Sequence, residues 1–113
     1  MGSSSLSVVV PVYGRDDPAH FAESLESITE KQTRSPSEVV VVADGSLTPD
    51  LNDVLSTRDD LTVIRLKENR GAGAARAAGV KNVTHDLVAF QDSDDLSVPE
   101  RFETQIQYIR ERP

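Results

Sequence analysis

The chain has 113 residues, a net charge of −7 and no cysteine. This length fits one domain, and the lack of cysteine excludes a disulfide framework and a thiolate metal site. The acidic balance argues against a nucleic-acid binder, which presents Lys and Arg to phosphates. Because the sequence has no membrane-spanning apolar stretch and no signal peptide, we expect a cytoplasmic protein and interpret residues 1–5 as a tag or disordered terminus.

The first half of the chain predicts strand, helix, strand and helix. Residues 6–12 and 39–43 are short runs dominated by valine, typical of strands covered on both faces of a parallel sheet. After the first run, Pro18 begins a predicted helix with an apolar stripe. After the second run, residues 49–56 predict a short helix.

The second half continues this alternation. Residues 61–67 predict a strand, and Arg65 and Lys67 on one of its faces favour an edge position. The alanine-rich residues 72–82 predict a helix that packs closely on the sheet. Residues 87–91 predict a buried strand.

The last predicted helix begins at a capping-box pattern, Ser97–Glu100, with Pro99 in its first turn. Alternating strands and helices with right-handed crossovers imply an open, mostly parallel, Rossmann-like α/β sheet with helices on both faces. The simplest winding gives the strand order 3-2-1-4. Ligands bind such sheets outside the carboxyl ends of the strands, here between the first and fourth strands.

Three carboxylates follow the fourth predicted strand: Asp92, Asp94 and Asp95. Carboxylate oxygens suit Mg²⁺, Mn²⁺ or Ca²⁺, and Mg²⁺ is usually held by one or two carboxylates together with ligand phosphates. We interpret Asp92 and Asp94 as an Asp-x-Asp motif that binds a metal when a diphosphate completes its coordination. The alternative is a solvated acidic loop that precedes a helix.

Other strand ends deliver Tyr13 and Asp44 to the same edge of the predicted sheet. We therefore expect three strand ends to converge on one crevice. Asp16 and Asp17 are interpreted as solvated turn acids. A dinucleotide fingerprint at Gly71–Gly73 is not favoured, because its third glycine is missing and it follows the third strand.

Four motifs occur in order along the chain: Ser7–Tyr13, Ala43–Ser46, Asn69–Arg76 and Phe90–Pro99. Together they resemble the nucleotide-sugar-binding half of the family 2 glycosyltransferases, which have the GT-A fold. The resemblance covers residues 6 to about 109. It implies inverting transfer of a sugar from a nucleoside-diphosphate donor, with Mn²⁺ or Mg²⁺ as cofactor.

The resemblance also implies a set of binding residues: Pro11, Tyr13, Asp44, Arg76, Asp92 and Asp94. The first two would line the nucleoside pocket, and Asp44 would contact the base or ribose. Asp92 would lie near the ribose and donor sugar, and Asp94 would be the direct metal ligand. Arg76 would position the acidic turn or the diphosphate, unless it is a solvent-exposed helix arginine.

Family members continue into an acceptor-binding half that supplies the catalytic base, expected beyond Pro113. We therefore expect residues 6–113 to be a truncated donor-binding domain, inactive alone, from a parent at the cytoplasmic face of a membrane. UDP is the first expected nucleotide, before GDP and dTDP. The surface that the acceptor-binding half would cover is expected to be exposed and could support a homodimer. A non-catalytic binding or assembly module and a sugar-phosphate nucleotidyltransferase are the alternatives, and the latter lacks its usual glycine-rich loop here.

Overall fold

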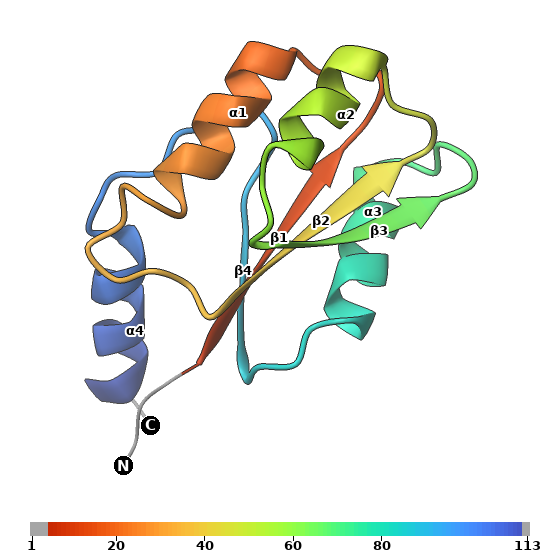
Figure 1. Cartoon of the computed structure of the whole chain (residues 1–113). Helices are drawn as coiled ribbons and strands as arrows, with labels where there is room; N and C mark the ends of the chain where they lie inside the picture. Colours follow the sequence, from red (N-terminus) through yellow and green to blue (C-terminus); the bar gives the residue numbers. More distant parts are fainter. Residues whose placement is uncertain (1–4, 112–113) are drawn as a thin grey trace.

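Strands and helices alternate along residues 5–111, the part of the chain that the computed structural model describes (Figure 1). The strands are β1 (Leu6–Val12), β2 (Glu38–Asp44), β3 (Leu61–Leu66) and β4 (Leu87–Phe90). The helices are α1 (Pro18–Ser27), α2 (Pro49–Ser56), α3 (Ala72–Lys81) and α4 (Arg101–Glu111). The interpretation of residues 1–5 falls, apart from Ser5, outside the described residues.

The four strands form one parallel sheet in the order β3-β2-β1-β4, which confirms the predicted order. Pairing of β1 with β4 reaches only Val9 and Phe90. The Gln91 N–H then donates to the Val9 carbonyl at 3.1 Å, and Pro11, two residues further, has no N–H to continue the ladder. The ends of β1 and β4 can therefore separate, as the crevice at a topological switch point requires.

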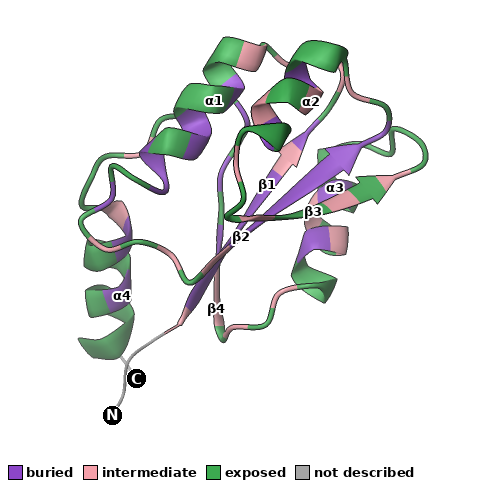
Figure 2. Ribbon diagram, viewed as in Figure 1, coloured by how far each residue is buried: buried purple, intermediate pink, exposed green. Residues whose placement is uncertain are grey.

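Helices cover both faces of the sheet, as expected (Figure 1). On one face, Val8 and Val10 of β1 belong to a core that includes Phe21 of α1, Leu51 of α2 and Phe102 of α4. On the other face, α3 packs through Ala75 against Val9, Val40 and Val42. Figure 2 shows that β1 and β2 are buried along most of their length, because they lie between these two layers.

Side chains just before α1 and α2 explain where these helices begin. The Asp17 carboxylate accepts the His20 N–H at 3.0 Å, and this bond lowers the pKa of Asp17. The Thr48 hydroxyl accepts the Leu51 N–H at 3.3 Å in the same way. A proline follows each capping residue, where its missing N–H costs little.

The capping box predicted at Ser97 is wrong, because α4 begins only at Arg101. The Ser97 hydroxyl donates instead to Gln91 Oε1 at 2.8 Å, and it accepts a bond from Arg101 Nη1 at 3.0 Å. The Arg101 N–H bonds to the Val98 carbonyl at 3.1 Å, which closes a turn before the helix. The Ser97 side chain therefore bonds to Gln91, the residue after β4, and does not cap α4.

Both edge strands expose side chains. On β3, Val63 and Arg65 are exposed, which agrees with the predicted edge position. Beside β4, an apolar groove runs along α4 and includes Phe90, Tyr108 and Ile109. The homodimer expected at such a surface stays a prediction. None of the described helices is both long and apolar enough to cross a membrane.

An ion network joins the end of α1 to the turn before β3 and should respond to acid. Arg58 Nη2 lies 2.7 Å from Glu30 Oε1 and 2.8 Å from Asp60 Oδ2. The bond from Arg58 lowers the pKa of Glu30 from 4.5 to about 2. A carboxyl with a lowered pKa stabilises the fold above its ordinary pKa, and this contribution is lost as pH falls toward the folded-state value.

We therefore expect the free energy of unfolding to fall as pH drops from 4.5 to about 2, measured by urea denaturation at each pH. Because the Glu30 side chain is 60% exposed, its share of the fall should not exceed about 1 kcal/mol. The fall should be smaller in Glu30→Gln, which does not titrate. An equal fall in both proteins would assign the acid sensitivity to other carboxyls.

Candidate functional site

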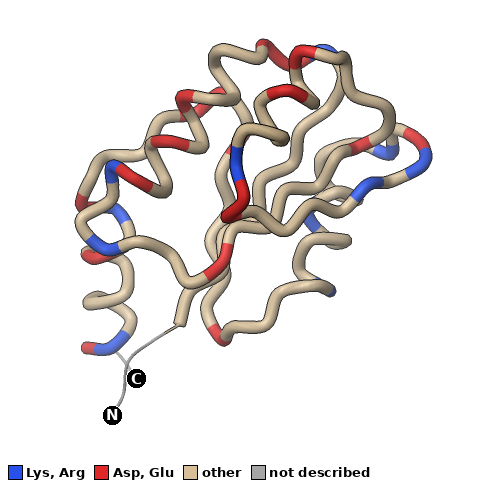
Figure 3. Tube along the Cα trace, viewed as in Figure 1, with Lys and Arg blue, Asp and Glu red and all other residues tan. Residues whose placement is uncertain are grey.

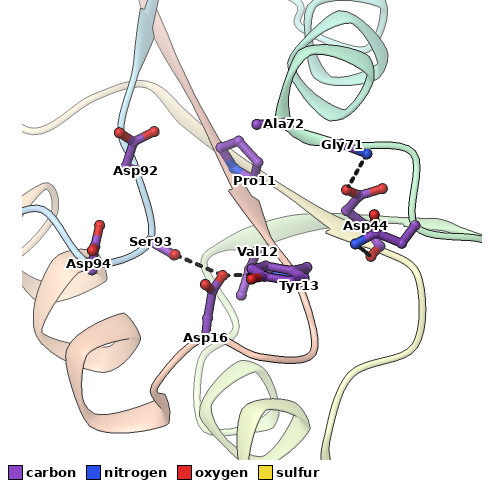
Figure 4. A pocket seen from close by; sticks show the side chains of 11 residues that line it. Pro11, Val12, Tyr13, Asp16, Asp44, Gly71, Ala72, Asp92, Ser93 and Asp94 are labelled. Atoms are coloured by element: carbon purple, nitrogen blue, oxygen red, sulfur yellow. Dashed lines mark hydrogen bonds between the residues drawn. The ribbon is translucent and has the colours of Figure 1, made fainter.

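The carboxyl ends of β1, β2 and β4 surround a cavity of about 300 Å³ (Figure 4). Of the six predicted binding residues, five line it: Pro11, Tyr13, Asp44, Asp92 and Asp94. Figure 4 shows Asp92 and Asp94 on one side, Asp44 on the other and Pro11 between them. The predicted convergence of three strand ends on one crevice is therefore confirmed. A cavity of this size is at the lower end of small-molecule sites.

The acidic turn after β4 has three exposed aspartates, and the two that line the cavity, Asp92 and Asp94, lie in different surroundings. Asp92 Oδ1 accepts a hydrogen bond from Arg76 Nη2 at 3.0 Å, so Arg76 of α3 reaches the turn although it does not line the cavity. No described residue bonds to the carboxylate of Asp94. Asp94 therefore offers oxygens that are free to bind a ligand, whereas one oxygen of Asp92 is already bonded to the Arg76 guanidinium.

The carboxylates of the turn suit a metal only with help from a ligand. Within residues 5–111, no group of three His, Cys, Asp or Glu side chains converges closely enough to hold a metal ion. Two carboxylates with oxygen donors from a bound diphosphate match the coordination that Mg²⁺ prefers in proteins. The residues present therefore fit a cation that arrives with a phosphate ligand, and they do not form a closed metal cage.

Asp44 is 4% exposed and its carboxylate is already engaged. Its two oxygens accept the N–H groups of Arg70 at 2.7 Å and Gly71 at 2.9 Å. Gly71, at a φ of 95°, precedes α3 and provides no side-chain cap. An anionic side chain at this helix start is favourable, because it satisfies unpaired N–H groups and faces the positive end of the helix dipole. Asp44 thus fixes the start of α3, and its predicted contact with a base or ribose stays a prediction.

Asp16 is a site residue that the sequence reading missed. It was interpreted as a solvated turn acid, but it lines the cavity and accepts two hydrogen bonds. One comes from the Tyr13 N–H at 2.9 Å and the other from the Ser93 hydroxyl at 2.8 Å. Asp16 therefore ties the loop after β1 to the acidic turn after β4. The only local signal is its spacing of three residues from Tyr13, which permits an Asp-backbone turn.

A second hollow of about 550 Å³ adjoins the first and shares Tyr13, Asp44 and Asn69 with it. Arg15 and Lys67 also line it. Figure 3 shows basic positions on β3 and in the loop that follows, with an acidic position among them. Asp44 and Glu68 line the same hollow, so this mouth of the site places two cations beside two carboxylates.

Residues 7–113 match the family described as Glycosyl transferase family 2. The chain belongs to this family. This match confirms the family resemblance that the four sequence motifs indicated. The parallel sheet agrees with it.

Two curated relatives of this family 2 domain show how much of a longer protein it matches. An uncharacterized glycosyltransferase of Haemophilus influenzae is 38% identical over 110 residues, which is 95% of this chain and 41% of the relative. A UDP-Gal:alpha-D-GlcNAc-diphosphoundecaprenol beta-1,3-galactosyltransferase of Escherichia coli is 39% identical over 106 residues, 91% of this chain and 38% of the relative. The family 2 domain thus spans about two-fifths of the length of these relatives.

A solved structure supports the fold of the family 2 domain. TarS 1-349 of S. aureus in complex with UDP superimposes with a TM-score of 0.81 at 33% identity, covering 95% of this chain and 32% of that chain. The same TarS fragment was also solved with UDP-GlcNAc. The GT-A-type α/β fold expected from the sequence is confirmed.

Proposed function

We propose that this domain binds the nucleoside diphosphate of a sugar donor together with Mn²⁺ or Mg²⁺. UDP is the nucleotide that we expect first. The observation that carries the proposal is the single cavity that joins Pro11 and Tyr13 at the end of β1 to Asp94 after β4. The UDP and UDP-GlcNAc complexes of TarS and the UDP-Gal named for the Escherichia coli relative support it.

The nucleoside is proposed to lie against the β1 side of the cavity. Pro11 and Tyr13 offer an apolar ring surface there, and Tyr13 is 41% exposed, so a flat base can pack on it without displacing other side chains. Asp44 supports this side by fixing the start of α3, and a base or ribose contact from its oxygens is part of the proposal. Lys67 and Arg15 add positive charge at the entrance.

The diphosphate and the cation are proposed to lie on the β4 side. Asp94 would hold the cation directly, and Asp92 would share it while keeping its bond to Arg76. When bound, the cation supplies charge neutralisation for the departing nucleoside diphosphate. Arg76 holds the Asp92 carboxylate against the repulsion of the neighbouring acids.

A protein containing this domain is proposed to transfer the sugar with inversion. That reaction needs a general base within reach of the acceptor hydroxyl. The acids around the cavity have other tasks: Asp16 and Asp44 bind backbone N–H groups, and Asp92 and Asp94 serve the cation. We therefore propose that the base is not among the described residues and that this chain alone binds donor without transferring sugar.

Calorimetric titration of the purified chain with UDP, GDP, dTDP and UMP, with and without Mn²⁺, tests this proposal. We expect UDP to bind more tightly in the presence of Mn²⁺, because Asp92 and Asp94 would hold the cation and its charge would neutralise the diphosphate. UMP should gain much less from Mn²⁺, since it lacks the second phosphate. Binding of no nucleoside diphosphate under either condition would favour the assembly-module alternative. A Mn²⁺ effect equal for UDP and UMP would contradict the proposed metal position.

A further inference from the structure

Gln91 is a buried polar residue directly before the acidic turn, and its amide is fully used. The side chain is 3% exposed. Nε2 donates to the Asp95 carbonyl at 2.7 Å and to the Ser24 hydroxyl at 2.9 Å. Oε1 accepts from the Ser97 hydroxyl at 2.8 Å and from Arg101 Nη1 at 2.9 Å. These four bonds occupy both N–H donors and both acceptor sites of a side-chain amide.

The donor end of Gln91 reaches both ends of the acidic turn. It bonds the Asp95 carbonyl directly. It also bonds Ser24, which is fully buried in α1 and donates in turn to the Asp92 carbonyl at 3.0 Å. The turn itself is closed by the Asp95 N–H, which donates to the same Asp92 carbonyl at 3.1 Å. Asp92 and Asp94, the two residues proposed to hold the cation, therefore lie in a turn whose backbone is fixed by side-chain hydrogen bonds at Asp92 and Asp95.

The acceptor end of Gln91 is fixed by α4. Arg101 bonds Gln91 through Nη1, and its Nη2 donates to the Phe90 carbonyl at 2.9 Å. Burial lowers the pKa of the Arg101 guanidinium, and the nearby Asp95 charge opposes that shift. A charged donor makes a stronger hydrogen bond than a neutral one. The amide of Gln91 is thus held in one orientation, with its donors directed toward the acidic turn.

We infer that Gln91 is a positioning residue that sets the geometry of Asp92 and Asp94 before any ligand arrives. The inference deepens the proposed function and rests on it, because it concerns the same cation site. Groups that hydrogen-bond to metal ligands and orient them affect metal affinity nearly as much as the ligands themselves. A polar network in which every donor and acceptor is paired is rigid. Gln91 does not line the cavity, so its action on the cation site would pass through the turn.

Gln32 provides a matched control because it is a second buried glutamine that bridges the same two helices. It is 8% exposed. Nε2 donates to the carbonyls of Ser27 and Val98, each at 2.8 Å, and Oε1 accepts the Phe102 N–H at 3.2 Å. None of these partners belongs to residues 92–95. Replacing Gln32 by leucine should therefore destabilise the fold as Gln91→Leu does, without releasing the acidic turn.

The test compares wild type, Gln91→Leu and Gln32→Leu in two measurements. Calorimetry with UDP and Mn²⁺ should show affinity weakened about tenfold or more in Gln91→Leu, as for other groups that orient metal ligands, and about threefold at most in Gln32→Leu. Amide hydrogen exchange followed by NMR without ligand should show faster exchange at Asp95 in Gln91→Leu and unchanged exchange there in Gln32→Leu. Ser24→Ala, a smaller change that removes the hydroxyl bonded to Asp92, should shift both measurements in the same direction.

Equal effects of the two leucine variants on affinity and on exchange would overturn the inference, because they would reflect lost stability alone. Unchanged exchange at Asp95 in both Gln91→Leu and Ser24→Ala would also overturn it. If wild type binds no UDP with Mn²⁺, the proposed function fails. Selective loss of Asp95 protection in Gln91→Leu would still support the hold of Gln91 on the turn, so the two failures are distinguishable. If Gln91→Leu does not fold, Ser24→Ala decides by the same criteria.

Discussion

Replacement of Asp94 by asparagine is expected to abolish the gain in UDP affinity that Mn²⁺ provides, a loss of about 100-fold, or about 2.7 kcal/mol. Asparagine has nearly the same shape but no negative charge, so the cation loses its direct anionic ligand. Because no described residue bonds to the Asp94 carboxylate, the substitution breaks no contact of the fold. Calorimetry with UDP and Mn²⁺ measures the affinity, and thermal unfolding verifies that stability is unchanged.

Asp86→Asn is the control for the change in net charge. Asp86 is exposed and directly precedes β4, at the opposite end of that strand from the acidic turn. Asp86→Asn removes the same charge as Asp94→Asn. It should leave UDP affinity within about threefold of wild type, because exposed charges more than a Debye length from the bound ligand are screened. Similar losses in both variants would mean that the effect of Asp94 is general electrostatics and that it is not a metal ligand.

Gly45→Ala is expected to destabilise the fold by about 3 kcal/mol, from backbone strain together with a steric clash. Gly45 has a φ of 87°, a conformation that residues with a side chain rarely adopt. An added Cβ would lie 2.8 Å from the backbone nitrogen of Asn69, which cannot move without displacing the loop before α3. That loop supplies the N–H groups bound by Asp44, so nucleotide affinity should fall as well. Urea denaturation measures the change in stability.

Gly73→Ala is the matched control for this substitution. Gly73 lies in the first turn of α3, its φ is not positive, and apart from the local backbone no atom lies within 4 Å of an added Cβ. Alanine should be neutral there or stabilise the helix by up to about 1 kcal/mol. If Gly45→Ala were as stable as Gly73→Ala, the close approach of Gly45 to Asn69 would have no part in holding the site together.

Local sequence signals predicted most of the fold. The valine runs of β1 and β2 indicated buried strands, and the switch point followed from the alternation of strands and helices. The proline after Thr48 fixed the start of α2 at Pro49, as predicted. These features depend on periodicity and on residues within a few positions, which is why a single sequence reveals them.

The contacts that shape the site join residues far apart in sequence. Ser93 bonds Asp16, 77 residues away, and Gln91 bonds Ser24, 67 residues away. The carboxylate of Asp44 meets N–H groups of the loop before α3, 26 and 27 residues later. Each of these side chains has many possible partners until the sheet brings two loops together. Sequence reasoning therefore identified the acids at the strand ends but could not say which of them bind backbone and which are free.

The most direct test of the proposed cation site is an assigned NMR spectrum of the chain titrated with Mn²⁺, with and without UDP. Mn²⁺ is paramagnetic and broadens the signals of amides near it. We predict that Asp92–Asp95 broaden first, at substoichiometric Mn²⁺, and only when UDP is present. Broadening that ignores UDP, or that begins at acids away from the turn such as Asp50 and Asp53 of α2, would contradict a cation held between the acidic turn and a nucleoside diphosphate.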